Sequence, residues 1–299
     1  MGKEHSPLIE IDASRMVSAV TFTANGEYLV GGGQEIRAWR VENNKQLPAT
    51  TLEACNISCL SVSKDGRWIA AGTISEVIIW DAKTGKKTMT HGEGFSCVTG
   101  VDFSPDGTRL VVASFNCTAA IWDIATLERM LTLRHEQWVR AAKYSAQGDR
   151  IATATYDHVR VWDKEGHLLI DIPVIVTPRF NTGLVWFNDH LFVVSDSTIM
   201  KFEASTGSTV SEWAVPDTNR FSCIALPQNG DFIAYSTIRT VTFCDASTHS
   251  QLGLIHHPHD IVSIAISPDD RLLAISGEKK IAIKSLSHHC EYPLPLDYT

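Results

Sequence analysis

The chain has 299 residues, of which 44% are hydrophobic and 20% are charged, and its formal net charge is -8. Such a composition is typical of a globular protein, and an acidic surface repels the phosphates of nucleic acids and anionic lipids. We therefore expect no nucleic-acid partner and no membrane association.

Seven cysteines without framework spacing favour buried thiols in a reducing compartment, so we expect a cytoplasmic protein. No apolar window is long enough to span a bilayer, and the N-terminal residues lack the apolar core of a signal peptide. Met1, Gly2 and Ser6 match the N-myristoylation pattern. The match leaves open whether Gly2 carries a lipid, although coincidence is the simpler interpretation.

The first strand-like segment is residues 7–13, Pro-Leu-Ile-Glu-Ile-Asp-Ala. Its residues alternate in polarity, which predicts a β-strand rather than a helix. No hairpin partner lies next to it in the chain, so its place depends on the segments that follow.

A two-residue turn signal then recurs about every 40 residues, which is the mark of a repeat array. The signals are Asn25-Gly26, Asp65-Gly66, Asp106-Gly107, Gln147-Gly148, Asn188-Asp189, Asn229-Gly230 and Asp269-Asp270. Asn-Gly and Asp-Gly accept the positive φ angles of tight hairpin turns, so each signal predicts a strand reversal.

Short β-branched runs surround each signal. In the third unit they are Val98–Phe103, Leu110–Ala113, Ala119–Trp122 and Arg129–Leu133. Runs of this kind with frequent turns predict an all-β protein, and a four-stranded unit must stack on its neighbours to bury both faces.

Trp80-Asp81, Trp122-Asp123 and Trp162-Asp163 close their third strands, and His91-Gly92 and His135 precede their units. With these motifs the chain resembles the WD40 family. The resemblance implies a seven-bladed β-propeller of four-stranded antiparallel blades over residues 7–287, with a C-terminal tail at 288–299. The Gly31-Gly32-Gly33 run and residues 151–155 are also similar to propeller modules of fungal cytoplasmic proteins, including those fused to NACHT-type ATPases.

The seventh unit has three strands and then runs into a Pro-containing tail. Residues 7–13 can supply its missing outer strand, which would close the ring and remove its open edges.

The resemblance also implies a buried hydrogen-bonded set of His, Ser or Thr, Asp and Trp inside a blade. The fourth unit carries the full set as His135, Thr155, Asp157 and Trp162, whereas the third has His91, Ser114 and Trp122 but Asn116 in place of Asp. A triad-like enzyme is the alternative reading, but groups that satisfy one another inside a blade are structural. We expect no enzyme activity, and mutation of Asp157 should lower stability.

Histidines and a cysteine gather at His256, His257 and His259 and again at His288, His289 and Cys290. The two groups should lie on opposite faces of the ring, roughly 20 Å apart, so they do not predict one metal site. Residues 31–33 lack the lysine and helix of a phosphate-binding loop and instead predict close strand packing. A surface zinc site that uses only one of the two histidine groups is the alternative, but we expect no metal and no cofactor.

The top face of such a propeller gathers the loops entering each first strand and the turns between second and third strands. The position before each first strand reads Met16, Asn56, Cys97, Trp138, Arg179, Arg220 and Asp260, with uncertain alignment in the fifth unit. Phe115 and Tyr156 lie in the neighbouring turns. Trp, Tyr and Arg dominate binding hot spots. The predicted partner-binding set is therefore Phe115, Trp138, Tyr156, Arg179 and Arg220, unless these side chains only pack together or lie scattered.

These observations predict a non-enzymatic, monomeric scaffold that binds a protein or peptide, as a regulatory or sensor module of a larger signalling assembly. The alternative is a reader of acidic or phosphorylated peptides that uses the arginines beside the aromatic side chains.

Overall fold

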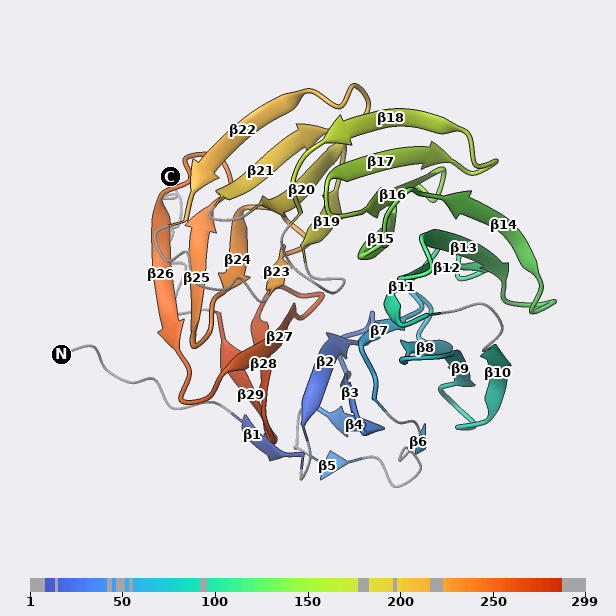
Figure 1. Cartoon of the computed structure of the whole chain (residues 1–299). Coiled ribbons are helices and arrows are strands. Elements are labelled where there is room, and N and C mark those ends of the chain that lie inside the picture. The colour runs from blue at the N-terminus through green and yellow to red at the C-terminus, as the bar shows by residue number, and fades with distance from the viewer. Residues whose placement is uncertain are drawn as a thin grey trace, which may run out of the picture.

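The computed structural model describes residues 9–13, 16–41, 45–46, 52–53, 56–91, 96–176, 183–195, 198–215 and 223–286. The strands form seven sheets arranged in a ring, which confirms the predicted all-β, seven-bladed propeller (Figure 1). Within the described part of the chain, no helix is long and apolar enough to cross a bilayer.

The inner strand of each blade lies closest to the ring axis. These strands are β2 (Val17–Phe22), β7 (Cys59–Val62), β11 (Val98–Phe103), β15 (Ala141–Tyr144), β19 (Leu184–Phe187), β23 (Cys223–Ala225) and β27 (Ile261–Ile266). The second strands are β3 (Tyr28–Gly33), β8 (Trp68–Gly72), β12 (Arg109–Ser114), β16 (Arg150–Ala154), β20 (His190–Ser195), β24 (Phe232–Ser236) and β28 (Leu272–Gly277).

The third strands and the outer strands complete the blades. The third strands are β4 (Glu35–Arg40), β9 (Val77–Asp81), β13 (Thr118–Asp123), β17 (His158–Asp163), β21 (Thr198–Glu203), β25 (Thr240–Asp245) and β29 (Lys280–Ser285). The outer strands are β10 (Lys87–His91), β14 (Arg129–Arg134), β18 (Leu168–Pro173), β22 (Thr209–Ala214) and β26 (Gln251–His256) in blades two to six. In the first blade two short pieces, β5 (Lys45–Gln46) and β6 (Leu52–Glu53), both pair with β4.

The N-terminal strand β1 (Ile9–Asp12) is the outer strand of the seventh blade. It pairs antiparallel with β29, so that Ile9 faces Ile283 and Ile11 faces Ile281. Figure 1 shows the two strands side by side, far apart though they are in the chain. The predicted closure of the ring by the N-terminal strand is confirmed. Residues 7 and 8 and the predicted tail at 288–299 lie outside the described residues.

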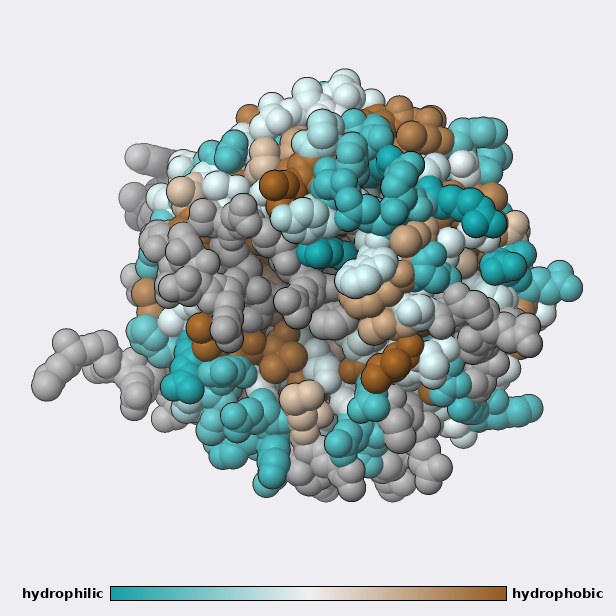
Figure 2. All heavy atoms as spheres, viewed as in Figure 1, coloured by the Kyte–Doolittle hydropathy of each residue, from teal (hydrophilic) through white to brown (hydrophobic). Residues whose placement is uncertain are grey.

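Hydrophobic side chains gather in seven clusters, one at each junction between neighbouring blades. The junction of blades two and three, for example, contains Ile79 from one side and Val98 and Trp122 from the other. Neither face of a blade is therefore left bare, as expected for stacked repeats. On the side shown in Figure 2, apolar residues also show at several places around the middle of the ring.

The reversals after the inner strands are confirmed, but their geometry differs from the predicted two-residue turn. In six blades only the second signal residue has a positive φ, as at Gly66 with φ 71°. In five of these blades the first signal residue instead caps the loop, as where the Asp65 carboxylate accepts hydrogen bonds from the Ser63 hydroxyl and the Arg67 amide. In the fourth blade Asp149 takes this role and accepts from the Ser145 hydroxyl. Only the fifth blade has a true two-residue hairpin, in which Asn188 has φ 50° and Phe187 pairs with His190.

Close packing explains the glycines of β3, as predicted. A Cβ atom on Gly31 would lie 2.8 Å from the Trp39 ring, and one on Gly33 would lie 1.9 Å from the Met16 carbonyl oxygen. No larger residue fits at Gly33, because the obstacle is backbone rather than a movable side chain.

Candidate interaction site on the top face

Two aromatic side chains from neighbouring blades stack on the top face. Phe115 lies in the turn between β12 and β13, and Trp138 lies in the loop between β14 and β15. Their ring centroids are 4.7 Å apart and their planes differ by 25°. The Phe115 amide donates to the carbonyls of Ser96 and Cys97, which holds its turn in place. Trp138 nevertheless remains 57% exposed. Such exposure is unusual for a large apolar side chain whose only role is packing.

Tyr156 and Arg140 continue this surface toward the fifth blade. The Arg140 guanidinium lies over the Tyr156 ring, 5.0 Å from its centroid, and donates a 2.8 Å hydrogen bond to the Val176 carbonyl. The Tyr156 carbonyl in turn accepts from the Val176 amide at 2.7 Å. Tyr156 is thus fixed from both sides, while 46% of it stays exposed.

Two aliphatic side chains extend the surface at its ends. Ile74 is 59% exposed, and its carbonyl accepts a hydrogen bond from the Cys97 amide of the next blade. Ile175 is 43% exposed beside Val176. We call the set Ile74, Cys97, Phe115, Trp138, Tyr156 and Ile175 the top-face arc. It crosses blades two to four and ends in the loop that leads to the fifth blade.

Three of the five predicted partner-binding residues, Phe115, Trp138 and Tyr156, lie together in the arc. Arg179 and Arg220 lie outside the described residues. The arginine that meets an aromatic ring of the arc is Arg140, which the sequence reasoning missed, as it missed Ile74 and Ile175. Ile74 could have been found, because it stands as far after its turn signal as Phe115 and Tyr156 stand after theirs.

The buried polar set of the fourth blade contains two of the four predicted residues, His135 and Trp162. His135 Nε2 lies 2.8 Å from the Thr153 hydroxyl, and Trp162 Nε1 donates to the same hydroxyl at 2.8 Å. The predicted hydroxyl, Thr155, instead donates to Asp157, whose other oxygen accepts from Gln137. The reason is that β16 ends at Ala154. Thr155 therefore caps the turn, whereas Thr153 lies within the strand.

Burial decides the protonation of the fourth-blade histidine. His135 is only 8% exposed, and desolvation lowers its pKa from 6.5 to about 4, so it is neutral at physiological pH. Its ring also meets Trp162 edge-on, with centroids 5.3 Å apart. Asp157 forms its hydrogen bonds elsewhere, so these residues do not assemble a His-Asp pair of the kind that activates a nucleophile.

Two polar residues of the third-blade set form hydrogen bonds near the turn between β12 and β13. The Ser114 hydroxyl donates to the Ser96 carbonyl at 3.0 Å, and Asn116 accepts from the Thr118 hydroxyl. The side chain of His91 lies outside the described residues. Here these groups fix loops.

In the first predicted histidine group, His257 is buried in the seventh blade much as His135 is buried in the fourth. His257 is 6% exposed, burial lowers its pKa, and its Nδ1 lies 2.9 Å from the His259 carbonyl oxygen. His257 stands as far before its turn signal as His135 does. His288, His289 and Cys290 lie outside the described residues. Elsewhere, no three His, Cys, Asp or Glu side chains of the described ranges form a group suited to a metal ion.

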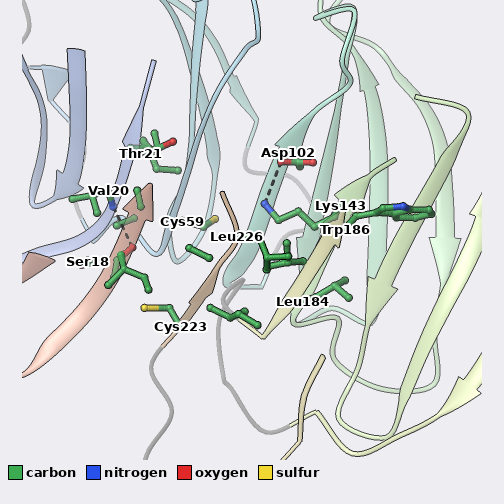
Figure 3. Close-up of a pocket in the computed structure, with 18 of the residues that line it drawn as sticks. Ser18, Val20, Thr21, Cys59, Asp102, Lys143, Leu184, Trp186, Cys223 and Leu226 are labelled. Atoms are coloured by element: carbon green, nitrogen blue, oxygen red, sulfur yellow. Dashed lines mark hydrogen bonds and ion pairs between the residues drawn. The ribbon is translucent and has the colours of Figure 1, made fainter. Parts of the chain in front are cut away.

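A central cavity of about 450 Å³ runs between the inner strands (Figure 3). Its main charged feature is an ion pair between Asp102 and Lys143, with 3.2 Å between the oxygen and nitrogen. Asp102 also accepts from the Tyr144 amide at 3.0 Å. The carboxylate therefore joins the third blade to the fourth, which is a structural role.

Three stretches of the chain match the family model described as WD domain, G-beta repeat, at residues 46–81, 85–123 and 127–163. The chain therefore contains three WD40 repeats within a seven-bladed β-propeller.

Curated relatives of this WD40 propeller share limited identity with it. WD repeat-containing protein 18 of Danio rerio is 23% identical over 82% of the chain and 63% of its own length. Apoptotic protease-activating factor 1 of Rattus norvegicus is 24% identical over 75% of the chain and 18% of its own length. The U3 small nucleolar RNA-associated protein 15 homolog of Xenopus laevis is 24% identical over 73% of the chain and 43% of its own length. The WD40 propeller thus spans less than two thirds of each of these relatives.

Proposed function

We propose that this WD40 propeller is a non-enzymatic scaffold that binds a protein or peptide partner on its top face. The observation that carries the proposal is the exposed stack of Phe115 and Trp138 between two blades. Aromatic side chains that are already packed together lose little conformational entropy when a partner binds. Such side chains are typical of binding hot spots. Propellers of the WD40 family generally act as interaction scaffolds, which supports the same assignment.

The finer role that we propose is a regulatory or sensor module of a larger signalling assembly. It is supported by a relative whose name describes an apoptotic protease activator, and which is much longer than the aligned region. The likeness to fungal NACHT-associated propellers points the same way. We further propose a monomeric ring in the cytoplasm, although one relative is named for a nucleolar RNA.

Recognition of acidic or phosphorylated peptides is the second candidate. It depends on Arg179 and Arg220, which lie outside the described residues. The arginine that contacts an aromatic ring of the arc is Arg140, and its guanidinium already donates to the Val176 carbonyl. The described contacts therefore support the general scaffold more than the phosphopeptide reader.

The test compares proteins recovered by affinity purification from the native source with three baits. These are the wild type, the Trp138→Ala variant, and a Val210→Ala control whose substituted side chain is 50% exposed on the outer strand β22. We expect a defined set of proteins to disappear with Trp138→Ala and to remain with Val210→Ala. Equal recovery with all three baits would reject the top-face site.

A further inference from the structure

We infer that the partner segment bound by the top-face arc is uncharged and presents a planar ring, aromatic or proline, that stacks on the open face of Trp138. This inference rests on the proposed top-face function and specifies the chemistry of its ligand. It follows from two observations, the charge state of the residues bordering the arc and the geometry of its aromatic pair.

Two carboxylates in the fourth-blade loops that carry Trp138 and Tyr156, those of Glu136 and Asp157, are bonded within the chain. Arg160 binds Glu136 at 2.7 Å and Asp171 at 3.2 Å. The two oxygens of Asp157 accept from Thr155 and Gln137. A ligand carboxylate or phosphate would have to break such pairs before it could use their charge, whereas a neutral apolar ligand leaves them intact.

The guanidinium of Arg140 is also engaged in contacts within the chain. It lies over the Tyr156 ring and donates to the Val176 carbonyl, so it fixes the start of the loop that leads to the fifth blade. It thereby stiffens the arc at Tyr156. In this position it acts as a support for the aromatic surface and is poorly placed to receive an anion from above.

The aromatic pair offers one ring face. Phe115 covers one side of Trp138 at a centroid distance of 4.7 Å, and the indole is still 57% exposed. Stacking on an indole favours a flat partner, and aromatic or proline rings are the side chains that provide one. Ile74 on one side and Tyr156 with Ile175 on the other extend apolar surface beyond the stack, where aliphatic neighbours of the ring can pack.

The experiment selects phage-displayed random dodecapeptides on the wild-type propeller and measures binding of the enriched peptides by fluorescence anisotropy. The expected consensus contains an aromatic residue or proline beside aliphatic residues, with no requirement for Asp or Glu. Affinity should fall about tenfold or more in Trp138→Ala, recover largely in Trp138→Phe, and stay unchanged in Val210→Ala. It should change less than about twofold between about 0.05 M and about 0.5 M NaCl, because no ion pair is formed.

Two kinds of failure are distinguishable. An acidic consensus, or Trp138-dependent binding of arrayed phosphopeptides that collapses in salt, would overturn the inferred ligand chemistry and leave the proposed top-face function standing. Peptides that bind Trp138→Ala as well as wild type, or no enrichment of any Trp138-dependent peptide, would overturn both. Circular dichroism of each variant verifies that the propeller is folded.

Discussion

A single hydroxyl, that of Thr153, joins two large buried side chains in the fourth blade. It accepts a hydrogen bond from the Trp162 indole and lies 2.8 Å from His135 Nε2. Thr153 itself has no exposed surface. If that hydroxyl were removed, the indole and the imidazole would both lose a partner in a site that water does not readily reach, and such losses are expensive.

We therefore predict that Thr153→Val lowers the free energy of unfolding by about 1–3 kcal/mol, although the two side chains have nearly the same shape. Urea unfolding followed by tryptophan fluorescence measures the change. Thr209→Val, on the exposed outer strand β22, is the matched control and should have little effect. If Thr155→Val proved more costly than Thr153→Val, the assignment of the buried hydroxyl would be wrong.

The sequence identified the correct histidine and tryptophan here but chose the wrong threonine. Thr153 and Thr155 are two residues apart, so an alternating pattern places both on the same face. What separates them is the end of β16 at Ala154. Strand ends depend on the hydrogen bonds of the turn, and a motif spacing alone does not encode them.

Closure of the ring depends on one short element, β1. Four residues pair with β29, and Ile11 and Ala13 are buried in the cluster between the seventh and first blades. Without β1, the seventh blade would end at β29 with a free edge and an uncovered apolar junction. The Glu10 to Lys280 ion pair on the same strand is exposed and adds little by comparison.

We predict that deletion of residues 1–14 causes a large fall in the melting temperature and promotes aggregation. Differential scanning calorimetry with light scattering provides the measurement. Glu10→Gln, which breaks the exposed ion pair but keeps the strand, should melt like the wild type. An unchanged melting curve for the deletion would show that β1 does not hold the ring closed.

The elements themselves were largely predictable because each repeat carries the same local signals. The inner strand predicted at Val98–Phe103 is found with those bounds as β11. The turn type was harder to predict, because Asp65 and Asn188 look alike in sequence. Asp65 caps a longer loop that begins at Ser63, whereas Asn188 adopts a left-handed conformation in a two-residue hairpin.

At the scale of the whole molecule, hydrogen bonds between successive inner strands join the blades. The Ser58 hydroxyl donates to the Val98 carbonyl, and the Thr99 hydroxyl donates to the Val139 carbonyl at 2.6 Å. Arg140 holds the equivalent position in the next blade and reaches the Val176 carbonyl. The repeat was therefore enough to predict the ring. The contacts of Arg140 with Tyr156 and Val176 could not be predicted in the same way, because the spacing of the turn signals carries no information about contacts between separate loops.

The stability of the whole ring should depend on pH in two separate windows. His135 and His257 are buried and have lowered pKa values, His135 from 6.5 to about 4. As the pH falls from 6.5 to about 4, these histidines become protonated in the unfolded chain but stay neutral in the folded chain, so the free energy of unfolding declines. At lower pH the capping carboxylates act in the same direction. Asp106, for example, has its pKa lowered below 3.8, chiefly by the Ser104 hydroxyl.

We predict that the free energy of unfolding falls as the pH drops from about 6.5 to about 4, by at most about 1.4 kcal/mol per pH unit for His135. Urea unfolding over a series of pH values gives this slope. His135→Gln should flatten it, because glutamine does not titrate. Asp106→Asn should leave this window unchanged and reduce the further loss below about pH 3.8. An equal slope in His135→Gln and wild type would mean that His135 is protonated in the folded ring, against the burial that the structure gives it.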